Sequence, residues 1–302
     1  GGVATHRGAD LLRLSDALRP LSDPGEVQAV AARTLGEYLG VTRVAYGEVS
    51  VDGADLLVAR SYVIGHAPEL TGRYRMVDFG ETLIAALRGG HTVAVPDVSA
   101  APELSAAERA AYAAVGIASL VGVPLVKHGR FVANLNVQNA APRAWTADDL
   151  ALIEETAQRT WAAVERARAE AALRASQATL HTFYDTAPFL MGIGEIDGDN
   201  LIAVSANRLV AEFIARPAPA IPGHSGLELG TPPLIDALWL AQLRKSQREG
   251  VPVHFEYQDV RASGTTWLSA TVAIIGKGPS GRPQYSFIAE NITERKQTEA
   301  AL

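Results

Sequence analysis

Apolar and polar residues follow a helical period over one long stretch, from Thr146 to about Tyr184. Thr146 and Asp149 have the spacing of a capping box at its start, and neither proline nor glycine follows until Pro188. The apolar positions keep a three–four spacing that shifts once, which favours a seam between two helices over a solvated linker helix. We therefore expect a connecting helix over residues 146–187 with one domain on each side. Its apolar positions are Ile153, Ala157, Val164, Ala167 and Ala171, then Leu173, Leu180 and Tyr184.

The pattern before this helix predicts an α+β domain over residues 9–168, with helices flanking an antiparallel sheet. Asp23 and Pro24 indicate the start of a helix, and Ser105 with Glu108 forms a second capping box. The expected helices are 9–18 (with Leu11, Leu14 and Leu18 on one face), 23–40, 80–88 and 105–115. The expected strands are 43–51, 56–64, 91–95, 119–127 and 130–138, and the stretch with Pro68 and Gly72 is expected to be a loop.

After Pro188 the pattern predicts a second α+β domain over residues 188–292, again with one antiparallel sheet. Residues 293–302 are expected to begin an output helix capped by Asn291. The expected strands are 190–195, 200–204, 252–260, 266–275 and 284–290, with helices at 207–213 and 234–249. Because the sequence ends within that last helix, we expect it to be part of a longer protein.

The composition argues against several kinds of partner and site. A formal net charge of −6 over 302 residues argues against a nucleic-acid partner, which requires a basic surface. The apolar run from Ile117 to Val126 is too short to cross a bilayer, so we expect a cytoplasmic protein with no membrane partner. There is no cysteine, and the seven histidines do not pair at metal-ligand spacing. We therefore predict no disulfide, no metal site and no catalytic thiol.

Several segments before the long helix resemble a GAF domain. They are Phe79-Gly80-Glu81-Thr82-Leu83, residues 90–98 (GHTVAVPDV), residues 116–125 (GIASLVGVPL), residues 131–135 (FVANL) and residues 145–150 (WTADDL). The resemblance implies a ligand cavity, with Tyr62, His66, Tyr74, His91 and Asp97 as candidate lining residues. It leaves the cofactor unknown, with haem through His91 or His66 as one option.

The second half resembles a PAS domain. The resemblance lies in residues 204–207 (VSAN), 252–257 (PVHFEY), 264–268 (GTTWL) and 288–297 (IAENITERKQ), where Asn291 replaces the family's usual aspartate. Cysteine is the residue to which phytochromes link bilin and LOV proteins link flavin, and Glu108 falls about where phytochromes have a pocket histidine. On this ground we exclude covalent bilin and LOV-type flavin as cofactors.

Together the two resemblances imply the non-catalytic sensory region of a bacterial signal-transduction protein, expected to be a two-component sensor histidine kinase whose effector domain lies outside this sequence. GAF-fold reductases of free methionine sulfoxide use cysteines, so an enzyme is disfavoured. Two alternatives remain: a dimerisation scaffold without ligand, and a photo- or redox sensor that binds haem, bilin or flavin. We expect a parallel homodimer, and a small-molecule ligand is an option that the sequence leaves open. The residues expected to relay the signal are Ile153, Ala157, Val164, Leu173 and Leu180 in the long helix, and Asn291, Thr293 and Glu294 at the output helix.

Overall fold

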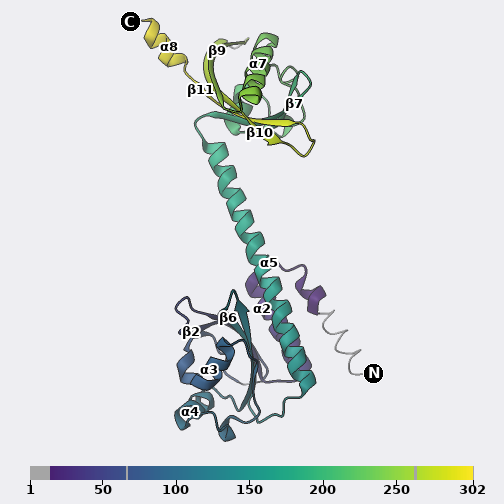
Figure 1. Cartoon of the computed structure of the whole chain (residues 1–302), viewed down its shortest axis with the longest axis vertical. Coiled ribbons are helices and arrows are strands. Elements are labelled where there is room, and N and C mark those ends of the chain that lie inside the picture. The colour runs from purple at the N-terminus through teal and green to yellow at the C-terminus, as the bar shows by residue number, and fades with distance from the viewer. Residues whose placement is uncertain (1–13, 66, 262–263, 302) are drawn as a thin grey trace. The chain divides into compact units, whose positions relative to one another are not determined.

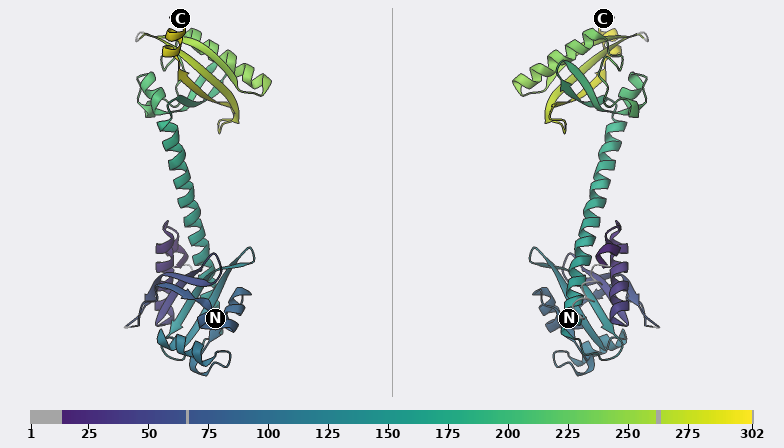
Figure 2. Two further views of the ribbon diagram at one scale, coloured as in Figure 1. Left: turned by 90° about the vertical axis from the view of Figure 1, so that its left-hand side faces the viewer. Right: turned by 90° about the vertical axis from the view of Figure 1, so that its right-hand side faces the viewer.

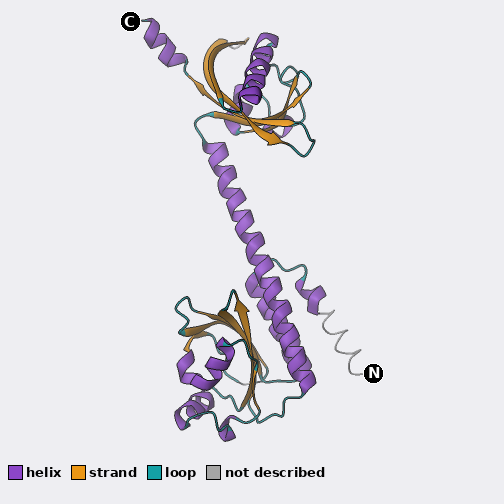
Figure 3. Cartoon of the chain, viewed as in Figure 1, coloured by secondary structure: helices purple, strands orange, loops and turns teal. Residues whose placement is uncertain are grey.

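The computed structural model describes residues 14–65, 67–261 and 264–301 (Figure 1). The chain forms two compact units, and the boundary falls between Arg174 and Ala175. Each unit combines helices with one antiparallel sheet, which confirms the predicted α+β class (Figure 3). No helix within the described ranges is long and apolar enough to cross a membrane.

The sheet of the first unit has six strands in the order β3-β2-β1-β6-β5-β4. The strands are β1 (Arg43–Val49), β2 (Asp55–Val63), β3 (Gly72–Arg75), β4 (Val93–Val95), β5 (Ser119–Lys127) and β6 (Arg130–Asn139). At its centre Val137 of β6 lies opposite Val44 of β1 on one side and Val121 of β5 on the other. Strand β3 corrects the sequence analysis, which assigned this stretch to a loop. It pairs with β2 and is held there by an ion pair between Arg73 and the buried carboxylate of Asp55.

Local capping signals fix where the helices of the first unit begin. Asp23 accepts from the amide of Glu26, and Ser105 and Glu108 form the reciprocal bonds of a capping box. The helices are α2 (Pro24–Leu39), η1 (Met76–Phe79), α3 (Glu81–Arg88), η2 (Val98–Ala100), α4 (Ala106–Ala114) and α5 (Ala147–Thr186). Residues 14–18 are also helical, whereas Leu11 lies outside the described residues.

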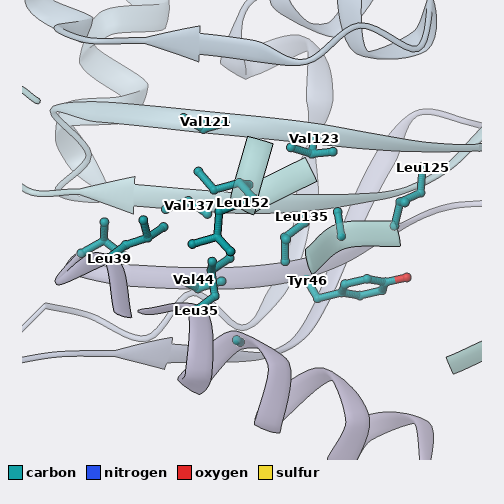
Figure 4. Packing of buried hydrophobic residues seen from close by; sticks show 14 of the residues in the cluster. Leu35, Leu39, Val44, Tyr46, Val121, Val123, Leu125, Leu135, Val137 and Leu152 are labelled. Atoms are coloured by element: carbon teal, nitrogen blue, oxygen red, sulfur yellow. The ribbon is translucent and has the colours of Figure 1, made fainter. Parts of the chain in front are cut away.

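Helices α2 and α5 cover one face of this sheet, and α3 and α4 lie over the other (Figures 1 and 2). Against α2 and α5 the sheet presents a mainly apolar core, in which Leu35, Val44, Leu135 and Leu152 converge (Figure 4). Alternate residues of β6, namely Ala133, Leu135 and Val137, supply one side of this core. The opposite face of β6 must therefore carry the residues between them.

The structure corrects the prediction of a seam between two copies for the first half of α5. Ile153 and Ala157 are fully buried in the core of their own unit. Val164 is equally buried in a cluster that contains Leu14 and Leu18, so the apolar face expected to meet a second copy is already covered. Periodicity identified the apolar face correctly, but it could not say that the chain's own sheet and α2 would cover it. In contrast, Leu173 and Leu180 are 59% and 65% exposed.

The second unit has a five-stranded sheet in the order β8-β7-β11-β10-β9. The strands are β7 (Leu190–Asp197), β8 (Asn200–Ala206), β9 (Val253–Arg261), β10 (Gly264–Lys277) and β11 (Pro283–Asn291). The helices are α6 (Arg208–Phe213), η3 (Ala218–Ala220), α7 (Pro233–Glu249) and α8 (Thr293–Ala300). Helix α7 packs on the sheet through Leu243, which is fully buried with Val253 and Val272.

Asn207 is a fully buried hydrogen-bond centre at the start of α6. Its amide nitrogen donates to the carbonyls of Tyr184 (3.0 Å) and Phe189 (2.8 Å). Its side-chain oxygen accepts from the amides of Met191 (3.1 Å) and Val210 (3.2 Å). One side chain thus fastens the last turns of α5, the start of β7 and α6 to one another.

The predicted output-helix residues lie where β11 leads into α8. The sequence predicted Asn291 as the cap of this helix. In the structure Ile292 directly precedes α8, so that prediction is wrong by one residue. Instead the Asn291 side chain accepts from the amide (3.0 Å) and hydroxyl (2.6 Å) of Thr293. The Thr293 hydroxyl in turn accepts from the amide of Trp267 in β10 at 2.9 Å. Glu294 is exposed on the first turn.

Candidate functional site

Strand β6 carries a row of amide side chains on the face opposite the apolar core. Asn134, Asn136 and Gln138 alternate with Ala133, Leu135 and Val137, as the period-two geometry of a strand requires. Asn134 is 4% exposed and Gln138 is 8% exposed, so this polar face is covered rather than solvated. Buried amides in such a row need hydrogen-bond partners, because an unmade bond costs about 1–3 kcal/mol.

The amide row lines a cavity of about 90 Å³ between the sheet, α3 and α4. Apart from that row the lining is mainly apolar, and it comes from the cluster that packs α3 and α4 against the sheet. Tyr74, Phe79 and Tyr112 form an edge-to-face chain of rings along it, with centroids 6.1 and 5.3 Å apart. Other lining residues are Leu56, Val58, Leu83, Leu87, Val93, Ile117, Leu120 and Gly122.

The hydrogen bonds of the row leave one acceptor open. The Asn134 amide nitrogen donates to the Asn136 side-chain oxygen at 3.0 Å. The Asn134 side-chain oxygen is buried and, among the described residues, has no donor. At the end of the row the Gln138 side-chain oxygen accepts from Arg43 at 2.9 Å. A residue of the cavity lining therefore carries one buried side-chain oxygen without a donor.

Arg43 is a buried cation behind the row, with only 1% of its surface exposed. Burial lowers the pKa of its guanidinium from the ordinary value. Besides Gln138, the guanidinium is 3.4 Å from the carbonyl of Val115, while its Nε is buried without a partner. Arg43 thus fixes the orientation of Gln138, so that the end of the amide row is set by a charge-assisted bond.

Of the five residues that the sequence analysis expected in the cavity, Tyr74 alone among the described ones lines it. Tyr62 packs against the core on the other face of the sheet, where its ring fills the space beside Gly36. His91 is exposed after α3. Asp97 caps η2 by accepting from the amide and hydroxyl of Ser99. His66 lies outside the described residues.

Four residues of the site were not predicted from the sequence: Asn134, Asn136, Gln138 and Arg43. The signal that could have found the row is the strict alternation of Ala133-Asn134-Leu135-Asn136-Val137-Gln138 in a strand with helices predicted on both sides. Within the described ranges no group of three or more His, Cys, Asp or Glu side chains is placed to hold a metal ion.

Several solved structures are similar to about half of this chain, and some of them are GAF domains. One is a far-red-absorbing dark state with bound biliverdin (17% identity, 53% of this chain and 99% of that chain, TM-score 0.46). Another is the phycoerythrobilin-bound GAF domain of a cyanobacterial phytochrome (16%, 54% and 97%, TM-score 0.48). A third is the free methionine-R-sulfoxide reductase of Neisseria meningitidis with its substrate (21%, 56% and 95%, TM-score 0.45). No curated protein sequence matches the chain.

These comparisons correct the cofactor prediction. Three similar structures contain biliverdin, phycoerythrobilin and phycocyanobilin, so the exclusion of bilin as a cofactor is wrong. The lack of cysteine addresses only a bond to a cysteine sulfur, and it leaves the cofactor open. The family is shown more directly: residues 23–164 match the model of the GAF domain, and this part of the chain is a GAF domain.

Proposed function

We propose that the chain is the sensory region of a signal-transduction protein, in which the GAF cavity binds a small neutral molecule that donates a hydrogen bond. The observation that carries this proposal is the buried side-chain oxygen of Asn134, which has no donor among the described residues and belongs to a residue that lines the cavity. A ligand N–H or O–H at this position would remove the cost of about 1–3 kcal/mol that an unpaired buried carbonyl imposes. The ring chain of Tyr74, Phe79 and Tyr112 supplies apolar contact for the rest of the ligand.

Size restricts the ligand class. A cavity of about 90 Å³ is smaller than the apolar cavity of about 150 Å³ that accepts benzene. Pyrazole is therefore a suitable probe, since its small ring carries one N–H donor for Asn134. 1-Methylpyrazole is the matched probe without a donor. We expect calorimetry on the whole chain to give about tenfold tighter binding of pyrazole, the ratio that corresponds to one hydrogen bond of about 1.4 kcal/mol.

The variant Asn134→Leu keeps the number and branching of the non-hydrogen atoms of the side chain and removes the acceptor, so it should abolish the preference for pyrazole. Gln177→Leu on the exposed part of α5 is the control, because it removes an amide that lies outside the cavity. If both probes bind equally to the unaltered chain, or neither binds, the ligand proposal is wrong. A dimerisation scaffold without ligand is then the better description.

We further propose that the second unit is a PAS domain. The segments that resemble that family lie at its structural junctions. Asn207 donates to the Tyr184 carbonyl at the end of α5, the Trp267 amide donates to the Thr293 hydroxyl at the start of α8, and Asn291 accepts from Thr293 at the exit from β11. A molecule that altered the sheet would act on both helices through these bonds. This arrangement supports a relay to an effector, which we propose to be a histidine kinase, with no catalysis within the present sequence.

A parallel homodimer is proposed through the apolar residues of α5 that its own unit leaves exposed. Leu173, Leu180 and Phe183 are 59%, 65% and 67% exposed. If this face forms the seam, one alanine inserted after Glu170 turns the following residues by about 100° and should disrupt output in the full-length protein. Seven inserted residues restore the face to within about 20° and should largely preserve output. A loss that depends only on inserted length would contradict the seam.

A further inference from the structure

The second unit contains its own cavity, of about 140 Å³, between the sheet and the helices α6 and α7. Most of its lining is apolar, and strands and helices both contribute to it. The main apolar residues are Leu190, Ile193, Leu201, Phe213, Ile221, Leu229, Trp239, Leu268 and Phe287. Its volume is close to that of the apolar cavity of about 150 Å³ that accepts benzene.

One carboxylate in this cavity has no partner. Asp236 lies in the first turn of α7, lines the cavity and is 8% exposed. Among the described residues its side chain makes no hydrogen bond and no ion pair. Burial raises the pKa of the Asp236 carboxyl, since the charged form loses its hydration. One carboxylate oxygen lies so close to Gly226 that a Cβ there would come within 2.4 Å of it. Glycine therefore leaves the carboxylate room inside the lining.

The two other charged residues of the lining, Asp259 and Arg261, form an ion pair. Asp259 is 2% exposed, and both of its carboxylate oxygens accept from the Arg261 guanidinium, at 3.1 and 3.2 Å. The same guanidinium lies over the ring of Phe213, 4.9 Å from its centroid. Two carboxylates and one guanidinium line the cavity, so one negative charge, that of Asp236, is left without a counter-ion.

A cluster of aromatic rings forms part of the apolar lining. Trp239 meets Phe255, Tyr257 and Phe287 edge to face, at centroid distances of 5.7, 6.1 and 5.1 Å. Rings in such a cluster offer apolar contact to a ligand body, and their faces attract a cation. Burial also raises the pKa of Tyr257 and Tyr285 above the ordinary value. Both phenols therefore stay neutral at physiological pH and do not add to the charge of the lining.

We propose that this cavity binds a small organic cation: an apolar body of roughly benzene size with one ammonium group that pairs with Asp236. The ammonium supplies the charge and the donors that the carboxylate lacks, and the body fills the aromatic lining. A neutral ligand of the same shape would leave the negative charge of Asp236 buried and uncompensated, which is unfavourable. The proposal is independent of the ligand proposed for the GAF cavity, which offers a neutral acceptor.

Three probes of one shape test it on the whole chain: benzylamine, benzyl alcohol and toluene, titrated by calorimetry at neutral pH. We expect benzylamine to bind at least about tenfold more tightly than benzyl alcohol, a ratio that corresponds to about 1.4 kcal/mol. Asp236→Asn keeps the shape of the side chain and removes its charge, so it should reduce benzylamine affinity about tenfold or more. The same variant should leave toluene binding unchanged.

Glu249→Gln is the matched control, because it removes an exposed carboxylate at the other end of α7 and should not alter any of the three affinities. Asn134→Leu should also leave benzylamine binding intact, which assigns the binding to the second unit. Thermal unfolding of Asp236→Asn, expected at or above the temperature of the unaltered chain, verifies that the variant is folded. Failure of benzylamine to bind, equal affinity for benzylamine and toluene, or unchanged benzylamine binding in Asp236→Asn would each overturn the proposal.

Discussion

The two units enclose cavities of similar character but opposite polar chemistry. The GAF cavity is lined by a row of neutral amides on β6, ending in a side chain that a buried arginine holds. The cavity of the second unit instead contains an ion pair between Asp259 and Arg261, and a carboxylate without a partner. Both are otherwise apolar. The polar groups therefore decide which ligands each can accept, since apolar lining alone distinguishes mainly size.

The difference also has a structural origin. Amides can bond to one another along a strand, so Asn134 and Asn136 satisfy part of each other's requirement. A carboxylate can only accept hydrogen bonds, so Asp236 needs a donor from another group or from a ligand. A neutral open acceptor costs about 1–3 kcal/mol in the empty protein, whereas an unpaired buried charge costs more and contributes more to binding once a ligand pairs with it.

The largest expected effect comes from the ion pair of the second unit. Arg261→Met leaves Asp259 buried without compensation and should lower the free energy of unfolding of this unit by about 3–5 kcal/mol. Urea unfolding followed by the fluorescence of Trp239 and Trp267 measures it. The double variant Asp259→Leu with Arg261→Met removes both charges and should recover most of the loss. A single variant as stable as the unaltered chain would show that the pair contributes nothing.

A carboxylate placed in the GAF cavity would reproduce the unpaired charge that Asp236 provides in the cavity of the second unit. Asn134→Asp should destabilise the first unit by about 2–3 kcal/mol at neutral pH, because a buried carboxylate gains no donor there. Asn136→Asp is the control, since this position is only half-buried and the charge keeps contact with water. Denaturant unfolding monitored through Trp145 and Trp161 would compare the free energies of unfolding of the two variants. Equal losses of stability would mean that the amide row is more hydrated than its burial indicates.

The converse substitution removes a charge. Asp236→Asn should raise the free energy of unfolding by about 1 kcal/mol at pH 7, the lower end of the cost of an unsatisfied buried group. Burial raises the pKa of Asp236, so the folded chain holds its proton more readily than the unfolded chain. The buried charge of Asp236 therefore lowers the free energy of unfolding of the unaltered chain fully above the folded-state pKa. This destabilisation disappears as the pH falls below the ordinary value of 3.8. A gain that persisted in acid would contradict this origin.

The smallest expected effect lies on the surface, where α8 leaves the second unit. Glu256 accepts from Lys296 at 2.8 Å and from Arg295 at 2.6 Å, and these bonds hold its pKa below the ordinary value. Glu256→Gln should speed amide hydrogen exchange in α8 without changing either cavity. The stabilisation by Glu256 is present above its unfolded-state pKa and is lost as the pH falls through the lower folded-state value. Exchange that is equally fast in both proteins at neutral pH would mean that the pairs do not hold the helix.

Much of the fold followed from short-range rules in the sequence. The capping box of Ser105 and Glu108, the cap at Asp23 and the turns between strands involve residues within a few positions, so local patterns predicted these elements nearly to their ends. The α+β class and the GAF region likewise followed from the order of elements and from motifs.

Only the tertiary structure decided what covers each face. The sequence indicated that Ile153, Val164 and Leu18 are apolar and share helical faces, but the chain's own sheet and α2, not a second copy, bury them. In the sequence the amides of Asn134 and Gln138 are one side of an ordinary strand, whereas in the fold α3 and α4 close over this side. Periodicity reports the direction in which a side chain points. The groups it meets come from segments tens of residues away, and therefore only the folded chain determines burial and partners.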